Sequence, residues 1–132
     1  MTKVAVNNIE GAVPALPTFS QAVISKGHVF VSGIIGCDEE YNIVGGIHDQ
    51  TLAALNNMKK VLEGAGSGLE HVVKVTIFLT QMQRDFDVVN SLYKEFFQSQ
   101  ADAMPAKTLV GASSIPMGGF VQFDCIAEHP SE

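Results

Sequence analysis

Residues 104–127 read MPAKTLVGASSIPMGGFVQFDCIA, and this stretch decides the fold that we expect for the chain. Its pattern is strand, turn, strand. Side chains alternate between two faces over residues 106–113, and again over residues 120–127. The segment between them, residues 114–119, contains one proline and two glycines, which favour a turn. Two strands therefore end the chain, and each carries polar residues that packing alone does not require.

The polar residues of interest are Lys107 in the first of these strands and Gln122 in the second. Leu109 shares a strand face with Lys107, and Asp124 shares one with Gln122. We predict that the lysine and the amide meet in a cleft. The alternative is that both are exposed surface residues, as such side chains mostly are. Asp124 has two interpretations, as a substitute base or as the partner of a neighbouring cation.

The N-terminal third of the chain predicts three more strands, at residues 3–8, 21–25 and 28–35. Lys26 and Gly27 indicate a hairpin, so the second and third of these strands are expected to pair antiparallel. Residues 11–17 contain two prolines and are expected to form an extended loop. Residues 37–46 are acidic and glycine-rich, which indicates an exposed connection.

Two segments have helical periodicity. Apolar residues recur every three or four positions from residue 49 to about 63, which predicts an amphipathic helix. Asp49 is the expected N-cap, and Gly64 or Gly66 the expected stop. A second helix is expected from about residue 85 to 98. Its apolar stripe is better explained by core packing than by a ligand site, and consists of Phe86, Val89, Tyr93, Phe96 and Phe97.

Residues 71–80, between the two helices, predict a strand. Its apolar face consists of Val73, Val75, Ile77 and Leu79. The element order is then β-β-β-α-β-α-β-β, which predicts an α+β fold with one six-stranded mixed sheet and both helices on one face. Several strands are apolar on both sides, so we expect a partner subunit to cover the other face.

Length and composition limit the class of protein. A chain of 132 residues is expected to form one domain, residues 1–132, with a core of its own. Hydrophobic residues make up 46% and charged residues 17%, which indicates apolar surface buried between subunits. The formal net charge is -6 and the pI about 5.1. This balance argues against nucleic acid as the main partner, because nothing neutralises phosphate.

Cysteine usage and hydropathy indicate a cytoplasmic protein. The two cysteines, Cys37 and Cys125, lack the paired spacing of a metal site. A disulfide between them stays open, although two reduced thiols are favoured. No signal-peptide pattern begins the chain, and no apolar run of about 18 residues is present, so no membrane association is expected.

Six stretches together resemble the Rid family, also known as RidA, YjgF/YER057c/UK114 or endoribonuclease L-PSP. They follow the family's order and spacing over nearly the whole chain, and comprise residues 105–124, FSQAV at 19–23, VFVSG at 29–33, AGS at 65–67, VVK at 72–74 and FDVVN at 86–90. The resemblance implies a chorismate-mutase-like α+β fold and homotrimers with ligand clefts between subunits.

The resemblance also implies a chemistry. Deaminases of the family hydrolyse 2-imino acids to 2-oxo acids and ammonium without a cofactor, because the C=N bond is already electrophilic. The protein holds the carboxylate and orients a water molecule. In the family these tasks fall to an arginine, a glutamate, a tyrosine and the backbone around a Ser-Gly pair. Ser32 and Gly33 match that pair, and Asn90 matches an asparagine usual in the deaminases.

Three positions depart from the family pattern, with Phe19 at the tyrosine, Lys107 at the arginine and Gln122 at the glutamate. Lysine keeps the positive charge but lacks the planar fork of arginine, so it orients a carboxylate less well. Gln122 orients a water molecule yet accepts no proton from it, and losing a general base slows a reaction about a hundred- to ten-thousand-fold. Phe19 keeps the shape of the tyrosine but lacks its hydroxyl, so the cleft holds water less well.

We therefore predict a divergent Rid-family protein, an imine or enamine deaminase with weak or altered activity. The expected catalytic residues are Gln122 and Ser32, and the expected substrate-binding residues are Lys107, Gly33, Leu109, Phe19 and Asn90. The expected ligand is a small carboxylate, with no metal and no cofactor.

Two alternatives stay open. One is a trimer that binds a small carboxylate without turnover. The other is the ribonuclease or translation-inhibitor activity described for some relatives, against which the acidic balance argues.

Overall fold

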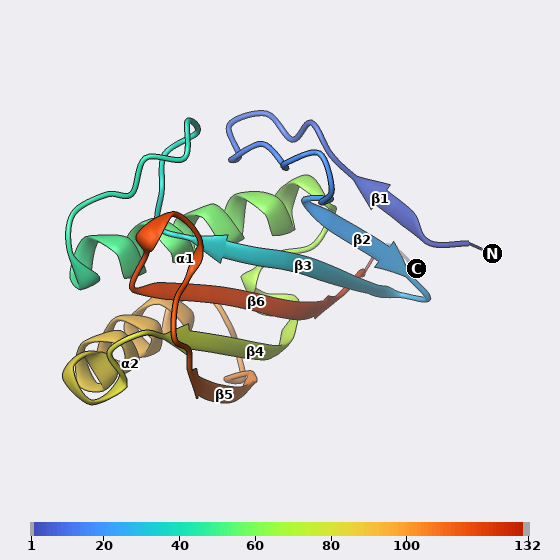
Figure 1. Ribbon diagram of the computed structural model, residues 1–132. Coiled ribbons are helices and arrows are strands. Elements are labelled where there is room, and N and C mark those ends of the chain that lie inside the picture. The colour runs from blue at the N-terminus through green and yellow to red at the C-terminus, as the bar shows by residue number, and fades with distance from the viewer. Residues whose placement is uncertain (1, 131–132) are drawn as a thin grey trace.

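The computed structural model describes residues 2–130 and has the predicted order of elements (Figure 1). The strands are β1 (Val4–Val6), β2 (Ala22–Ser25), β3 (His28–Ile35), β4 (Val72–Leu79), β5 (Ala106–Gly111) and β6 (Val121–Glu128). The helices are α1 (Ile47–Gly64) and α2 (Met82–Gln98), and single 3₁₀ turns occupy Leu69–His71 and Pro116–Gly118. The predicted α+β class is confirmed.

The six strands form one mixed sheet in the order β1-β2-β3-β6-β4-β5. Only the β4–β5 pair is parallel among the described strands, and the predicted β2–β3 hairpin is antiparallel. Strand β6, the last in the chain, lies between β3 and β4 at the centre of the sheet. The C-terminal stretch therefore joins the N-terminal strands to the β4–β5 pair.

Both helices cover one face of the sheet, as predicted, and the core lies between (Figure 1). Alternate residues of the central strands point into it, among them Val29, Val31, Val75, Ile77, Leu79, Phe123 and Cys125. The helices contribute Leu55, Met58, Leu62, Val89, Tyr93 and Phe97. Complete burial of a side chain of this size contributes about 1.5–3 kcal/mol, so this layer holds the helices on the sheet.

Helix α1 begins earlier than predicted. Its N-cap is Gly46, and Asp49 lies in the first turn without making a side-chain cap, so the prediction of Asp49 as N-cap was wrong. The C-terminal prediction holds, because the helix ends at Gly64. Gly66 has φ +84°, a conformation that favours glycine, and its N–H bonds the Glu63 carbonyl at 3.1 Å.

Two predicted core positions are exposed. A bulge between Val72 and Lys74 shifts the alternation of β4, so Val72 is buried while Val73 is 41% exposed. In α2 Phe86 is 43% exposed, and the neighbouring Asp85 is buried in its place. Arg84 makes this possible, because its Nε and Nη2 donate to the two carboxylate oxygens of Asp85 at 2.8 and 3.0 Å.

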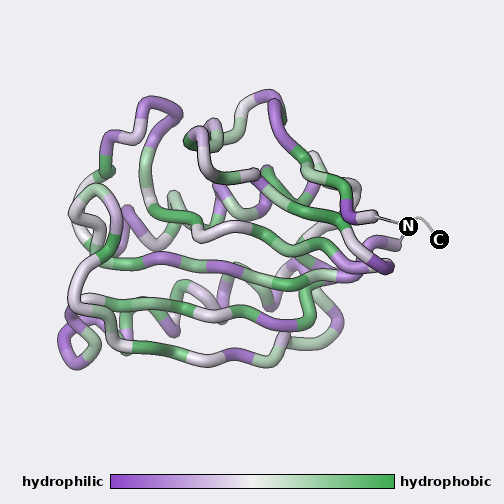
Figure 2. Tube along the Cα trace, turned by 45° about the vertical axis from the view of Figure 1, so that its right-hand side comes forward, coloured by the Kyte–Doolittle hydropathy of each residue, from purple (hydrophilic) through white to green (hydrophobic). Residues whose placement is uncertain are grey.

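Neither helix covers the opposite face of the sheet, which we call the open face. Its members include Val23, Phe30, Lys74, Thr76, Phe78, Thr108, Val110, Gln122, Asp124 and Ile126. Phe30 and Val110 are exposed there, whereas Lys74 and Asp124 form a polar centre. Figure 2 shows hydrophilic residues between hydrophobic ones in the middle of the sheet. The open face is therefore mixed, with exposed apolar side chains at Phe30 and Val110 around polar residues.

None of the helices within residues 2–130 is long and apolar enough to cross a membrane.

Candidate functional site

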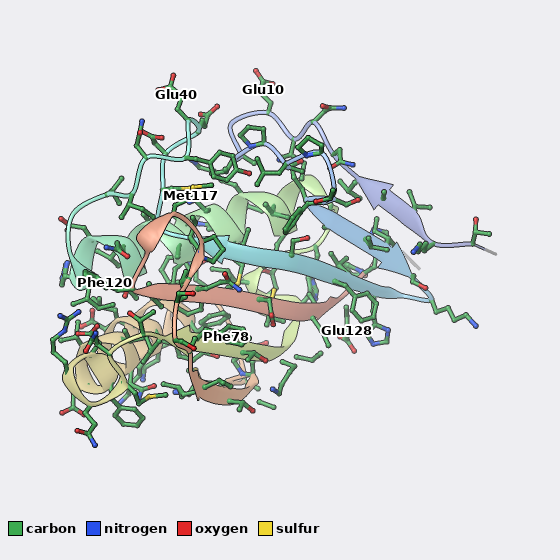
Figure 3. All side chains as sticks on the ribbon, viewed as in Figure 1. Glu10, Glu40, Phe78, Met117, Phe120 and Glu128 are labelled. Atoms are coloured by element: carbon green, nitrogen blue, oxygen red, sulfur yellow. The ribbon has the colours of Figure 1, made fainter. Side chains whose placement is uncertain are left out.

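A cavity with a volume of about 450 Å³ lies at one end of the sheet. Its floor includes Ile35, Gln122 and Phe78, which are neighbours in the register of β3, β6 and β4. Its walls come from residues 13–21, from the loop after β3 and from residues 112–117. Figure 3 shows Met117 on the turn between β5 and β6, and Glu10 and Glu40 on two nearby loops.

A buried glutamine fixes the first wall. The Nε2 of Gln21 donates to the Val13 carbonyl at 2.8 Å, and its Oε1 accepts from the Ile9 N–H at 3.1 Å. The Tyr41 hydroxyl donates to the Pro14 carbonyl and so joins this wall to the loop after β3. Proline-rich residues 13–17 are therefore held in place although they form no regular structure.

Two buried amides of α1 fix the chain around the cavity floor. The Nδ2 of Asn57 donates to the carbonyls of Ile35 and Cys37 at 3.1 and 3.0 Å. The Oε1 of Gln50 accepts from the Phe120 N–H at 2.8 Å, directly before β6. Our sequence interpretation missed these residues and Gln21. For Gln50 and Asn57 the available signal was an amide at a helix position where the 3.6-residue period calls for an apolar side chain.

Four of the predicted site residues line this cavity, namely Phe19, Ser32, Gly33 and Gln122. The Ser32 hydroxyl donates to the Ser20 carbonyl at 2.5 Å, so it is already engaged. A Cβ at residue 33 would lie 2.7 Å from Gln122 Nε2, so glycine lets the amide lie against β3. The Gln122 carboxamide has no hydrogen bond of its own within residues 2–130 and is available to a ligand or water.

The described lining of the cavity contains no lysine, arginine, histidine, aspartate or glutamate. A carboxylate bound there would find amide and hydroxyl groups from the same chain, but no cation. No residue of the described lining is a strong general base either. The cavity by itself is therefore a neutral site.

Lys107 lies elsewhere. It pairs with Val75 of β4, whose side chain is in the core, so Lys107 points toward α2. Its Nζ donates to Asn90 Oδ1 at 2.5 Å and lies 4.7 Å from the centre of the Tyr93 ring. Burial lowers the pKa of Lys107. Leu109, two residues further on the same face, is half-buried against the core. Lys107, Asn90 and Leu109 thus share one side of the sheet.

The predicted meeting of Lys107 and Gln122 does not occur within one chain. Gln122 pairs with Phe78 of β4, whereas Lys107 pairs with Val75. Residues three apart in a strand point to opposite faces, so the lysine and the amide lie on opposite sides of the sheet. The two can come together only when they belong to different copies of the chain.

Asp124 lies on the open face, in register with Thr76. Burial raises the pKa of Asp124, while Lys74 and a hydrogen bond from Thr76 oppose that rise. The Lys74 ammonium in turn donates to Thr108 Oγ1 at 3.0 Å. Lys74 therefore attracts this carboxylate, but no salt bridge with Asp124 forms within residues 2–130, and both interpretations of Asp124 stay predictions.

Both cysteines are free and buried. Burial raises the pKa of Cys37, which lines the cavity, and that of Cys125 to about 12, so both thiols are protonated at neutral pH. Across residues 2–130, no group of three or more histidine, cysteine, aspartate or glutamate side chains is placed to hold a metal ion.

Comparisons with known proteins agree with this architecture. Residues 10–129 match the family model described as Endoribonuclease L-PSP. "Protein mmf2, mitochondrial" of Schizosaccharomyces pombe is 39% identical over 130 residues, which are 96% of this chain and 98% of that protein. Because that relative is named mitochondrial, a cytoplasmic location for this chain stays a prediction.

Two further relatives carry names that bear on chemistry. The 2-iminobutanoate/2-iminopropanoate deaminase of Bos taurus is 34% identical over 118 residues, 88% of this chain and 83% of that protein. The crystal structure of E. coli TdcF with bound serine has a TM-score of 0.86 and 28% identity, and the match covers 93% of this chain and 97% of that one. Such solved structures confirm the chorismate-mutase-like fold. The chain belongs to the Endoribonuclease L-PSP family, the Rid family of RutC and UK114 proteins.

Proposed function

We propose that this protein hydrolyses the C=N bond of 2-imino acids to give 2-oxo acids and ammonium. The observation that carries the proposal is the neutral cavity, in which the unpaired Gln122 amide lies beside Ser32 and Gly33. Family relatives named as 2-iminobutanoate/2-iminopropanoate deaminases support the reaction class. Serine bound to the related TdcF supports a small ligand that carries a carboxylate.

The working site requires a second copy of the chain. A carboxylate needs a cation that the cavity lacks, and Lys107 offers one from the edge strand on the other side of the sheet. We propose a homotrimer in which Lys107 of one copy faces the cavity of the next. The open face supports assembly, because Phe30 and Val110 are exposed on it.

Each residue then has a task. The Lys107 ammonium binds the substrate carboxylate, and Asn90 and Tyr93 orient that ammonium. Gln122 holds a water molecule whose oxygen bonds to the imine carbon while a proton moves to nitrogen. The C–N bond then breaks, ammonia leaves and the 2-oxo acid remains. Since Gln122 accepts no proton, the rate depends on positioning and on the electrophilicity of the imine.

The experiment generates a 2-imino acid in situ with an amino-acid oxidase and follows its loss with and without the assembled protein. We expect faster loss than in buffer, and loss of that acceleration in Lys107→Met. Glu95→Gln, an exposed change on α2, is the matched control. Equal rates with and without the assembled protein would contradict the proposal.

A second candidate is a binding module without turnover, and the observation in its favour is the lack of a general base in the described lining. Titration calorimetry with 2-oxo acids and aromatic carboxylates separates the two, because binding without accelerated hydrolysis identifies a module. Ribonuclease activity has no comparable support, since the described lining offers no histidine for acid–base attack on a phosphodiester and the chain as a whole is acidic.

A further inference from the structure

The cavity combines a few polar groups with a larger apolar part. The polar groups include Ser32 and Gln122. The apolar part is a hydrophobic cluster separate from the main core, built on Ile35, Cys37 and Ile115, with Val13, Tyr41, Phe78 and Ala112 packed against it, and its Ile35 and Phe78 lie directly beside Gln122 in the sheet. A ligand that places its C=N group at the amide therefore directs its side chain toward apolar walls.

The size of the cavity sets the length of that side chain. A volume of about 450 Å³ corresponds to about fifteen water molecules, at roughly 30 Å³ each. The alanine-derived imine, with about six non-hydrogen atoms, would leave most of this space to water beside apolar residues. The leucine- and phenylalanine-derived imines, with about nine and twelve such atoms, displace that water.

The apolar part offers little to a polar side chain and nothing to a charged one, because Ser114 is a neighbouring hydroxyl in the described lining that makes no hydrogen bond, and no charged residue belongs to that lining. The Tyr41 hydroxyl is already engaged with the Pro14 carbonyl, and burial keeps the Cys37 thiol protonated by raising its pKa. A charged group in the ligand would lose its water without gaining a partner, which is penalised heavily in a site of this kind.

From these features we infer that the site selects 2-imino acids with branched aliphatic or aromatic side chains over small and over charged ones. This inference rests on the proposed function and names its substrate class. Each added methylene in an apolar pocket changes specificity by about three- to fourfold. We therefore expect kcat/KM to be about 10- to 100-fold higher for the leucine-derived imine than for the alanine-derived one.

The test compares imines generated in situ from leucine, phenylalanine, alanine and glutamate. A preference for the first two supports the inference, and equal or better hydrolysis of the alanine- or glutamate-derived imine overturns it. If no imine is hydrolysed, the proposed function fails and binding decides the inference separately. Tighter calorimetric binding of 4-methyl-2-oxopentanoate than of pyruvate then supports it, and equal, reversed or undetectable binding overturns it.

A variant in the apolar part of the cavity tests the inference a second time. Ala112→Phe fills the cavity, so the leucine-derived imine should lose about tenfold in kcat/KM while the alanine-derived one keeps its value. Ala112→Val is a smaller change for use if the phenylalanine disturbs folding, and it should give a smaller loss with the same selectivity. Asn56→Phe adds the same ring on the exposed side of α1 and should change neither substrate. An equal loss for both substrates contradicts the inference.

Discussion

The two sides of the sheet offer a ligand different things. On the open side, the cavity floor presents an unpaired amide at Gln122 among apolar residues and no charge. On the helix side, Lys107 presents a charge that Asn90 and Tyr93 already hold, and it does not line this cavity. The open side therefore offers space for a ligand but no charged group, and the helix side offers the charged group of Lys107 outside this cavity.

This difference has a functional consequence. A strand carries neighbouring residues to opposite faces, so a single copy cannot bring Lys107 to Gln122 without breaking the sheet. Assembly can do so, because it places the edge strand of one copy against the cavity of another. Activity, on our proposal, is then a property of the oligomer and should disappear whenever the copies separate.

The largest expected effect concerns the open side. Gln122→Glu adds a proton acceptor where the water molecule is held, so we expect kcat for imine hydrolysis to rise by about a hundred- to ten-thousand-fold. Steady-state kinetics on an imine generated in situ measures the change. Gln122→Met is the control, because it keeps the length of the side chain without a hydrogen-bonding group, and it should be slower than the natural protein. A glutamate variant no faster than the natural protein would show that Gln122 does not hold the reacting water.

The next prediction tests whether the two sides meet between copies. Lys107→Met should weaken carboxylate binding about 10- to 100-fold. Gly33→Leu should disable the other half, because any Cβ there crowds the Gln122 amide. When the two inactive variants are unfolded together and reassembled, about a quarter of the sites receive both intact halves.

Recovered activity of that size confirms shared sites. The control is the double variant Lys107→Met/Gly33→Leu reassembled with each single variant, which supplies no intact site. If the mixture of single variants is as inactive as these controls, the sites are not shared between copies. Lys107 of one copy then does not act with Gln122 of another.

The sequence allowed the fold to be predicted because its signals are local. Alternation in β6, the Lys26-Gly27 hairpin and the apolar period of α1 each act over a few residues. The errors arose where pairing or side-chain contacts override the apolar pattern. The bulge that buries Val72 depends on the pairing of β4 with β6. The burial of Asp85 depends on a bidentate contact with its sequence neighbour Arg84, which a pattern of apolar residues does not reveal.

The site could be predicted in part, for the same reason. Matching to a family motif identified Phe19, Ser32, Gly33 and Gln122, and the structure gathers these four around one cavity. Alternation gives the faces of one strand relative to itself, but only the register between strands shows whether Lys107 and Gln122 share a face. The buried amides Gln50 and Asn57 were missed because their partners are backbone groups distant in sequence.

A smaller effect is expected at the polar centre of the open face. Burial raises the pKa of Asp124 above its unfolded value, so folding favours the protonated acid. The resulting stabilisation is complete below the unfolded pKa of about 4 and is lost as pH rises through the folded pKa. At neutral pH the buried, ionised carboxylate destabilises the folded protein. Asp124→Asn should therefore raise the melting temperature by a few degrees at pH 7 and little at pH 3.

Thermal unfolding over this pH range measures the effect, with the exposed Asp102→Asn as control. If Asp124→Asn instead lowers the melting temperature at pH 7, the attraction of Lys74 outweighs burial. The open face would then carry a stabilising ion pair, and both sides of the sheet would hold a charged group in a fixed place.

The smallest expected effect isolates how the helix side holds its charge. Tyr93 is buried, and its hydroxyl has no hydrogen-bond partner among residues 2–130, while its ring lies under the Lys107 ammonium. Tyr93→Phe removes an unsatisfied polar group and keeps the ring. The free energy of unfolding should therefore stay constant or rise by up to about 1 kcal/mol, with ligand affinity unchanged.

Tyr93→Leu is the matched variant, since it removes the ring as well. Loss of the cation–π contact should weaken carboxylate binding by about two- to fivefold, because the ammonium is then oriented by Asn90 alone. Calorimetry on both variants separates ring from hydroxyl. If Tyr93→Phe weakens binding as much as Tyr93→Leu does, the hydroxyl and not the ring positions Lys107. The Tyr93 hydroxyl would then have to act through a bound water molecule that joins it to the Lys107 ammonium.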